Sequence, residues 1–175
     1  MAEEKKEPWL NYLALTTVVF AVCATLSTLK GGGFSTKSVM MQAQASDQWA
    51  YFQSKSIKGY LYELQRDKLE MELKAGVRGA AGEYRKKIDY YQQEITRYKA
   101  EKEEIRKKAE EFEKTRDEAR THSGAFGMAA MFLQIAILLS SIAALMKQKY
   151  FWFLGMGAGC FGLFYFFNGF FLFMK

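Results

Sequence analysis

The sequence predicts an all-α integral membrane protein, in which three transmembrane helices carry a long antiparallel helical (coiled-coil) hairpin between the first and the second. Two observations predict it: three apolar stretches are each long enough to cross a bilayer, and a long polar stretch separates the first two. The predicted segments are an N-terminal tail at 1–8, spans at 9–29, 124–146 and 150–175, a helical hairpin at 30–123 and a basic loop at 147–149.

The first span contains no charged residue from Trp9 to Leu29. It is long for the apolar region of a cleaved signal peptide, so we interpret it as an uncleaved signal anchor. Gly31, Gly32 and Gly33 follow it, and such a run predicts a break in the helix. Ser35 or Thr36 would then cap the next helix.

The second half of the hairpin segment has the clearest period. Its apolar residues alternate at steps of three and four, and Lys102 fills the one gap. This spacing is the seam of a coiled coil. Arg85 to Arg120 hold 12 Lys/Arg and 10 Asp/Glu, a mixed surface typical of a solvated helix, so no nucleic-acid partner is expected. The predicted seam consists of Ile88, Tyr91, Ile95, Tyr98, Ile105, Ala109 and Phe112.

The first half carries a weaker repeat, and glycines lie between the halves. The segments 34–75 and 83–123 differ in length by a single residue, and each would form a helix about 60 Å long. Matched lengths favour a hairpin with its tip at about 76–82; the alternative is two helices that pair with other chains. The repeat consists of Ala43, Ala50, Ile57, Leu64 and Met71, and the glycines are Gly76, Gly79 and Gly82.

Trp49, Tyr51 and Phe52 present more aromatic surface than one solvated helix leaves uncovered. The returning helix, another subunit or a partner protein would cover it. The expected interface of the arm therefore comprises Trp49, Tyr51, Phe52, Ile57, Leu64, Ile88, Tyr91, Ile95, Tyr98, Ile105 and Phe112.

The last two spans are joined by a loop so short that they must fold back on each other. Gly155 and Gly159, and Ala158 and Gly162, have small-xxx-small spacing, which predicts close helix contacts within the chain or between subunits. Polar amides at membrane depth bond across helices or, in an oligomeric channel, line a pore. The expected membrane interface comprises Gln134, Gly155, Gly159, Gly162 and Asn168.

No recognisable catalytic constellation occurs in the sequence. His122 is the single histidine, and Cys23 and Cys160 form no CxxC pair, so we expect no catalytic residue, no metal site and no cofactor. The glycines from Gly157 to Gly162 match GxGxxG superficially, but they lie in an aromatic membrane segment and not after a strand. The spans contain no ionisable residue, which argues against a proton-coupled transporter.

Lysines near the span ends predict the orientation. With three spans, the N-terminus and the 147–149 loop share one side, which holds Lys5, Lys6, Lys147 and Lys149. We therefore expect both to be cytoplasmic and the arm to be periplasmic.

The chain resembles a family of small bacterial membrane proteins known as domain of unknown function 4337. The most specific part of the resemblance is QASDQWAYFQSKSIK, followed by the charged helix EYRKKIDYYQQEITRYKAEKEEIRKKAEEFE and by FLQIAILLSSIAALMKQKYFW. The resemblance implies residence in the inner membrane, but no activity and no catalytic residue.

The sequence thus predicts a non-enzymatic scaffold of the inner membrane that forms homo-oligomers through its arm and its membrane helices. One alternative is an accessory subunit whose periplasmic arm binds an unidentified membrane or envelope protein. A second is an oligomeric channel. Beyond these, the lipid bilayer is the only expected partner.

Overall fold

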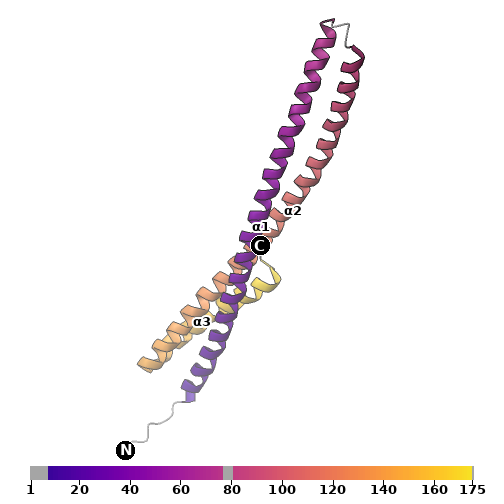
Figure 1. Ribbon diagram of the computed structural model, residues 1–175. Coiled ribbons are helices and arrows are strands. Elements are labelled where there is room, and N and C mark those ends of the chain that lie inside the picture. The colour runs from indigo at the N-terminus through magenta and orange to yellow at the C-terminus, as the bar shows by residue number, and fades with distance from the viewer. Residues whose placement is uncertain (1–7, 77–80, 175) are drawn as a thin grey trace, which may run out of the picture. The chain divides into compact units, whose positions relative to one another are not determined.

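The structure is a computed structural model that describes residues 8–76 and 81–174. All regular secondary structure in these residues is helical, and it forms α1 (Pro8–Lys74), α2 (Ala81–Met146) and α3 (Lys149–Phe171) (Figure 1). Each helix contains a stretch that is long and apolar enough to cross a membrane, as predicted. Residues 1–7 of the predicted tail and residues 77–80 of the predicted tip lie outside the described residues.

The predicted break at Gly31–Gly33 is wrong, because α1 runs through these residues without interruption. A Cβ on Gly31 would lie 3.1 Å from Cβ of Phe126 on α2, so this glycine serves close packing and does not end the helix. Ser35 and Thr36 accordingly lie inside α1 and cap nothing.

α2 likewise continues through the expected end of the arm. Ser123 lies within this helix, and its hydroxyl donates a hydrogen bond to the Gly31 carbonyl at 3.0 Å. The side chain therefore ties α2 to α1 at the point where both helices had been expected to stop.

The chain forms two compact units, and α1 and α2 contribute to both. One unit consists of Met1–Val39 and Arg116–Lys175 and is called the three-helix unit below. The other, Met40–Thr115, is called the two-helix unit.

In the three-helix unit, large side chains of α1 and α2 pack onto glycines of α3. The ring of Phe20 lies on Gly159, the side chain of Leu133 lies on Gly162, and the Phe126 ring packs where a Cβ on Gly169 would be only 2.8 Å away. Phe20, Leu133 and Phe126 are almost fully buried as a result. The missing side chains of α3 are thus what allows the three helices to approach one another.

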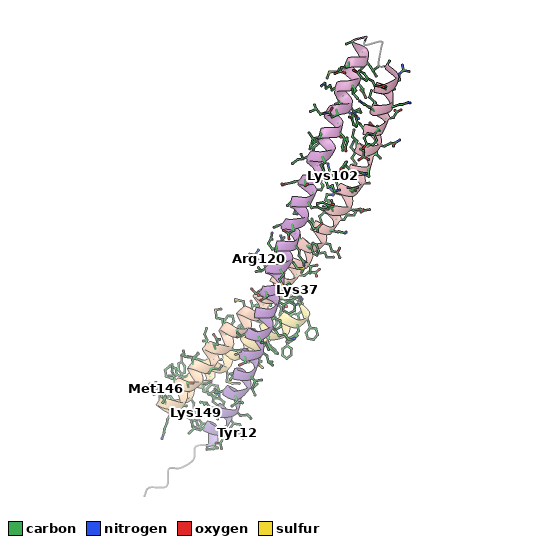
Figure 2. All side chains as sticks on the ribbon, viewed as in Figure 1. Tyr12, Lys37, Lys102, Arg120, Met146 and Lys149 are labelled. Atoms are coloured by element: carbon green, nitrogen blue, oxygen red, sulfur yellow. The ribbon has the colours of Figure 1, made fainter. Side chains whose placement is uncertain are left out.

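One end of the three-helix unit is closed by aromatic residues. The rings of Trp9 and Trp152 have centroids 6.2 Å apart, and the Trp152 indole donates a hydrogen bond to the Thr16 hydroxyl at 3.2 Å. Figure 2 shows Tyr12 and Lys149 at this end of the unit. The contacts join the start of α1 to the start of α3.

In the two-helix unit, α1 and α2 run side by side (Figure 1). Their contacts occur in reverse order, because partners on α2 have lower numbers as the numbers on α1 rise. The pairs, from low to high on α1, are Trp49 with Glu113 at 3.0 Å, Lys55 with Glu101 at 2.6 Å, Glu63 with Lys99 at 3.6 Å and Arg66 with Gln92 at 2.8 Å.

We predict that Gly159→Ala destabilises the three-helix unit. The added Cβ would lie 2.7 Å from two ring carbons of Phe20 and still closer to its Cζ, and overpacking of this kind costs about 1–3 kcal/mol. Thermal unfolding in detergent, followed by circular dichroism, measures the loss. Gly157→Ala on the same helix is the control, since no heavy atom lies within 4 Å of its added Cβ. Equal melting temperatures for the two variants would contradict the packing described here.

Candidate interaction surfaces

The predicted seam of α2 faces inward in the two-helix unit. Ile95, Tyr98, Ile105 and Ala109 are buried. The three remaining members of the seam, Ile88, Tyr91 and Phe112, are half-buried. The three-and-four spacing therefore identified the packed face of this helix.

Lys102 occupies the gap in this seam, and two aromatic rings of α1 accommodate it. Its ammonium lies 5.4 Å from the ring centroid of Phe52 and 5.3 Å from that of Tyr60. A cation over an aromatic face is attracted by the ring quadrupole, and the lysine stem covers apolar surface while the charge stays near water. The lysine thus fits a seam position that an apolar residue would otherwise fill.

The packed face of α1 is not the face that the seven-residue repeat indicated. Ala45 and Ser56 are buried, and Gly59 between the helices is half-buried. A Cβ on Gly59 would lie 3.6 Å from Cβ of Tyr98, so the glycine lets this tyrosine come close. Small and polar residues alternate on this face with aromatic ones such as Trp49 and Tyr62, and for that reason a search for apolar periodicity did not find it.

The seven-residue repeat of α1 is left exposed instead. Ile57, for example, lies one position after Ser56 and two before Gly59, which places it roughly 100° and 160° away from them around the helix. Ile57, Leu64 and Met71 are 61%, 65% and 64% exposed. We call the repeat, with its exposed neighbour Leu61, the outer stripe of α1; it consists of Ala43, Ala50, Ile57, Leu61, Leu64 and Met71.

The aromatic cluster near the start of the two-helix unit is covered in part by the returning helix. The Trp49 indole donates a hydrogen bond to Glu113 on α2, and its ring meets Phe52 edge-on at 5.6 Å. Tyr51 remains 49% exposed, although the Lys55 ammonium lies 5.5 Å from its ring centroid. Contacts within the chain thus cover the cluster only in part.

A tyrosine cluster that the sequence reasoning missed lies between the same helices. The Tyr62 ring on α1 stacks on Tyr98 at 5.7 Å and meets Tyr91 and Tyr90 at 5.7 and 6.4 Å. The pKa of Tyr62 is raised, chiefly by its electrostatic interaction with the neighbouring Tyr90. Tyr62 lies three positions after Gly59, on the face that has no apolar repeat.

The Lys55–Glu101 pair joins the helices between these two aromatic clusters. The ammonium donates to the carboxylate at 2.6 Å and also lies over the Tyr98 ring, 5.2 Å from its centroid. The hydrogen bond lowers the pKa of Glu101 and raises the pKa of Lys55. Both side chains keep partial contact with solvent, at 18% and 34% exposure.

In the three-helix unit, the glycines predicted as an interface are filled by the chain's own side chains. Gly155, Gly159 and Gly162 are all buried. Gly155 packs against α2, where its added Cβ would lie 3.1 Å from the Ala136 carbonyl oxygen. Of the two readings left open by the sequence, contact within the chain accounts for these residues.

The two amides predicted at membrane depth have different surroundings. The Asn168 amide is buried and closes the end of α3: it accepts from the Met174 backbone N–H at 2.8 Å and donates to its carbonyl at 3.3 Å. It thus bonds to its own chain end and not across helices. Gln134 lies on an exposed face of α2.

His122 links all three helices of the three-helix unit. Its ring stacks on Phe34 of α1 with centroids 4.5 Å apart, and its Nδ1 lies 2.8 Å from the carbonyl oxygen of Gly169 on α3. A carbonyl only accepts, so Nδ1 carries the proton. The histidine therefore acts as a packing and hydrogen-bonding residue at this position.

Within residues 8–76 and 81–174, no group of three or more His, Cys, Asp or Glu side chains is placed to hold a metal ion. Acids and bases of the two-helix unit instead pair with one another along and between the helices, as Arg106 does with Glu103 at 2.8 Å.

Comparison with known proteins places the chain in a family. The family described as "Domain of unknown function (DUF4337)" matches residues 9–172, so the chain belongs to it. Neither the comparison with curated proteins nor that with solved structures found a match.

We predict that the Lys55–Glu101 pair makes the two-helix unit acid-sensitive. Because the pKa of Glu101 is lowered from 4.5 in the folded chain, the contribution is complete above pH 4.5 and is lost as the pH falls through the lowered pKa. Because the pKa of Lys55 is raised from 10.5, the alkaline loss begins only above that value. The melting temperature of Glu101→Gln should lie below that of the wild type at pH 7, and the difference should vanish in acid.

Glu104→Gln is the matched control, since Glu104 is an exposed carboxylate of the same helix. It should leave the melting temperature unchanged across this range. A difference between wild type and Glu101→Gln that is constant from pH 7 to pH 3 would contradict the assignment.

Proposed function

We propose that this chain is a non-enzymatic structural protein of the bacterial inner membrane that assembles with copies of itself through its arm and its membrane helices. In this proposal, residues 30–123 form an antiparallel coiled-coil hairpin. The reverse order of the contacts between α1 and α2, from Trp49–Glu113 to Arg66–Gln92, supports the hairpin. The burial of the predicted α2 seam supports the coiled coil.

The outer stripe of α1 is the observation that carries the proposal. It places a row of large apolar side chains on a face that α2 leaves uncovered, with Leu61 55% exposed beside Ile57 and Leu64. Contiguous exposed apolar surface on a solvated element marks an interaction site. The seven-residue spacing is the spacing that a second helix packs against.

A second copy of α1 is the partner that this stripe fits best. On α2, in the described part of the two-helix unit, Tyr90 is the only large apolar side chain that is exposed. The outer face of α2 is therefore charged, and an α2 helix of another copy would set charges against apolar side chains. Pairing one outer stripe with another buries apolar surface on both sides, as an isologous contact does.

The membrane anchors would decide the direction of this pairing. Two copies inserted in one membrane present α1 in the same orientation, so the two outer stripes would run parallel. In that arrangement Ile57 would face Ile57 of the second copy, and Leu64 would face Leu64. The lysines near the span ends support placing the N-terminus and the 147–149 loop in the cytoplasm and the arm in the periplasm.

In this proposal, the membrane helices contribute to self-association through faces other than those of the buried glycines. Gly155, Gly159 and Gly162 are already filled within the chain, whereas Gly157 lies exposed on α3 with open space around it. These outer faces contact either lipid or a second copy. We therefore assign the larger part of the self-association to the arm.

We predict that Ile57→Glu/Leu64→Glu separates the copies. Two charges placed on the stripe would remain in contact with apolar surface in the assembly, which is unfavourable, while in the separated chain they would face water. The mass of the detergent-solubilised particle, measured by light scattering, should fall from a multiple of 20.1 kDa toward that of one chain.

Gln93→Glu/Ala100→Glu is the matched control. It adds the same charge at the same seven-residue spacing, but on exposed positions of α2, and should leave the mass unchanged. A wild-type particle that contains a single chain would contradict the self-association proposal. Co-purification of one stoichiometric second protein with that single chain would favour the accessory-subunit alternative.

A further inference from the structure

A hollow of about 370 Å³ lies on the surface of α1 in the three-helix unit. It begins where the uncharged stretch from Trp9 to Leu29 ends. Its lining combines apolar residues with two basic side chains, and consists of Leu29, Lys30, Gly33, Phe34 and Lys37.

The helical spacing sets the two lysines of this hollow on one face. Lys30 and Lys37 are separated by two turns, or about 10 Å along the axis, and by only about 20° around it. Their flexible stems span several ångströms, so both ammonium groups reach a ligand that lies midway between them. Gly33 occupies that midway position.

Gly33 leaves the centre of the hollow open. No heavy atom lies within 4 Å of the position that a Cβ would take on this residue. A ligand can therefore approach the helix backbone between the two lysines. Gly31, by contrast, is packed against Phe126 and contributes no open surface.

The remaining walls are suited to an amphipathic ligand. The Phe34 ring is fixed by its stack on His122 and lies 6.0 Å from the Phe126 ring, so this wall is rigid. Leu29, on the membrane side of the lysines, is 71% exposed. It offers apolar surface where an acyl chain would enter the bilayer.

No described residue of this chain neutralises the charge of Lys30 or Lys37. Among the described residues, no carboxylate lies within ion-pair distance of either lysine, whereas Lys55 is paired in the two-helix unit. Two ammonium groups that share one hollow without a carboxylate favour an anionic ligand. Lysines that border an apolar span favour one at the membrane surface.

We propose that this hollow binds the phosphate headgroup of an anionic phospholipid. The phosphate diester lies over Gly33 and accepts hydrogen bonds from the ammonium groups of Lys30 and Lys37, and one acyl chain lies along Leu29. The site lies within the three-helix unit of a single chain, so it does not depend on the self-association proposed above.

Retention of lipid by the full-length chain in detergent tests the proposal, with native mass spectrometry as the measurement. Wild-type chain titrated with phosphatidylglycerol should bind one molecule in preference to phosphatidylcholine. Gly33→Leu should abolish this preference, because the new side chain fills the hollow, and its Cβ meets no heavy atom within 4 Å. Gly32→Leu is the matched control, since its added Cβ also has open space but Gly32 does not line the hollow.

Removing the charges gives a second and independent test. Lys30→Gln/Lys37→Gln should weaken phosphatidylglycerol binding by about tenfold or more, since each lysine near a lipid phosphate contributes separately. Lys86→Gln/Lys87→Gln, which removes two exposed lysines from α2, should leave binding unchanged. Circular dichroism confirms that each variant remains helical.

Three results would overturn the proposal. The first is a Gly33→Leu chain that binds phosphatidylglycerol as well as Gly32→Leu does. The second is equal binding of phosphatidylcholine by the wild type, which would show that the headgroup charge has no effect. The third is displacement of the lipid by inorganic phosphate at similar concentration, which would show that the acyl chain contributes nothing.

Discussion

A helix with a single neighbour can bury only one of its faces, and this constraint governs the two-helix unit. α2 satisfies this constraint, because its apolar residues lie along one seam and its other faces are charged. α1 does not, since small and aromatic residues such as Ala45 and Trp49 pack against α2 while Ile57 and Leu64 stay exposed on the far side. The two helices are therefore not equivalent. α2 buries its one apolar face within the unit, whereas α1 has a second apolar face that stays exposed.

The three-helix unit contains the three stretches that are long and apolar enough to cross a membrane, and in lipid the hydrophobic effect does not drive helices together. Close approach must then come from shape. Phe20, Leu133 and Phe126 project from α1 and α2 into the space left by Gly159, Gly162 and Gly169 of α3. Aromatic and aliphatic side chains on two helices thus fit against glycines on the third. These glycines therefore serve contacts within the chain.

The helical class, the three membrane-length stretches and the α2 seam could be predicted from the sequence, because each depends on a local pattern of apolar residues. The packed face of α1 could not, since Gly59 and Ser56 occupy it and neither contributes to an apolar period. The course of α1 through Gly31–Gly33 was also missed. Glycine permits a break but does not require one, and the contact of Gly31 with Phe126, which favours a continuous helix, joins residues far apart in the sequence.

The position of the outer stripe limits the assemblies that the arm can support. In the proposed assembly, a single self-complementary stripe on α1 would pair two chains and would then be fully used, as in any isologous contact. The charged outer face of α2 offers no second site of the same kind, because Tyr90 is its one large exposed apolar residue among those described in the two-helix unit. In the proposed assembly, any association beyond a pair would therefore need further contacts from the three-helix unit, where exposed apolar surface remains on α3. The arm would account for a pair, and the membrane helices would have to supply any higher order.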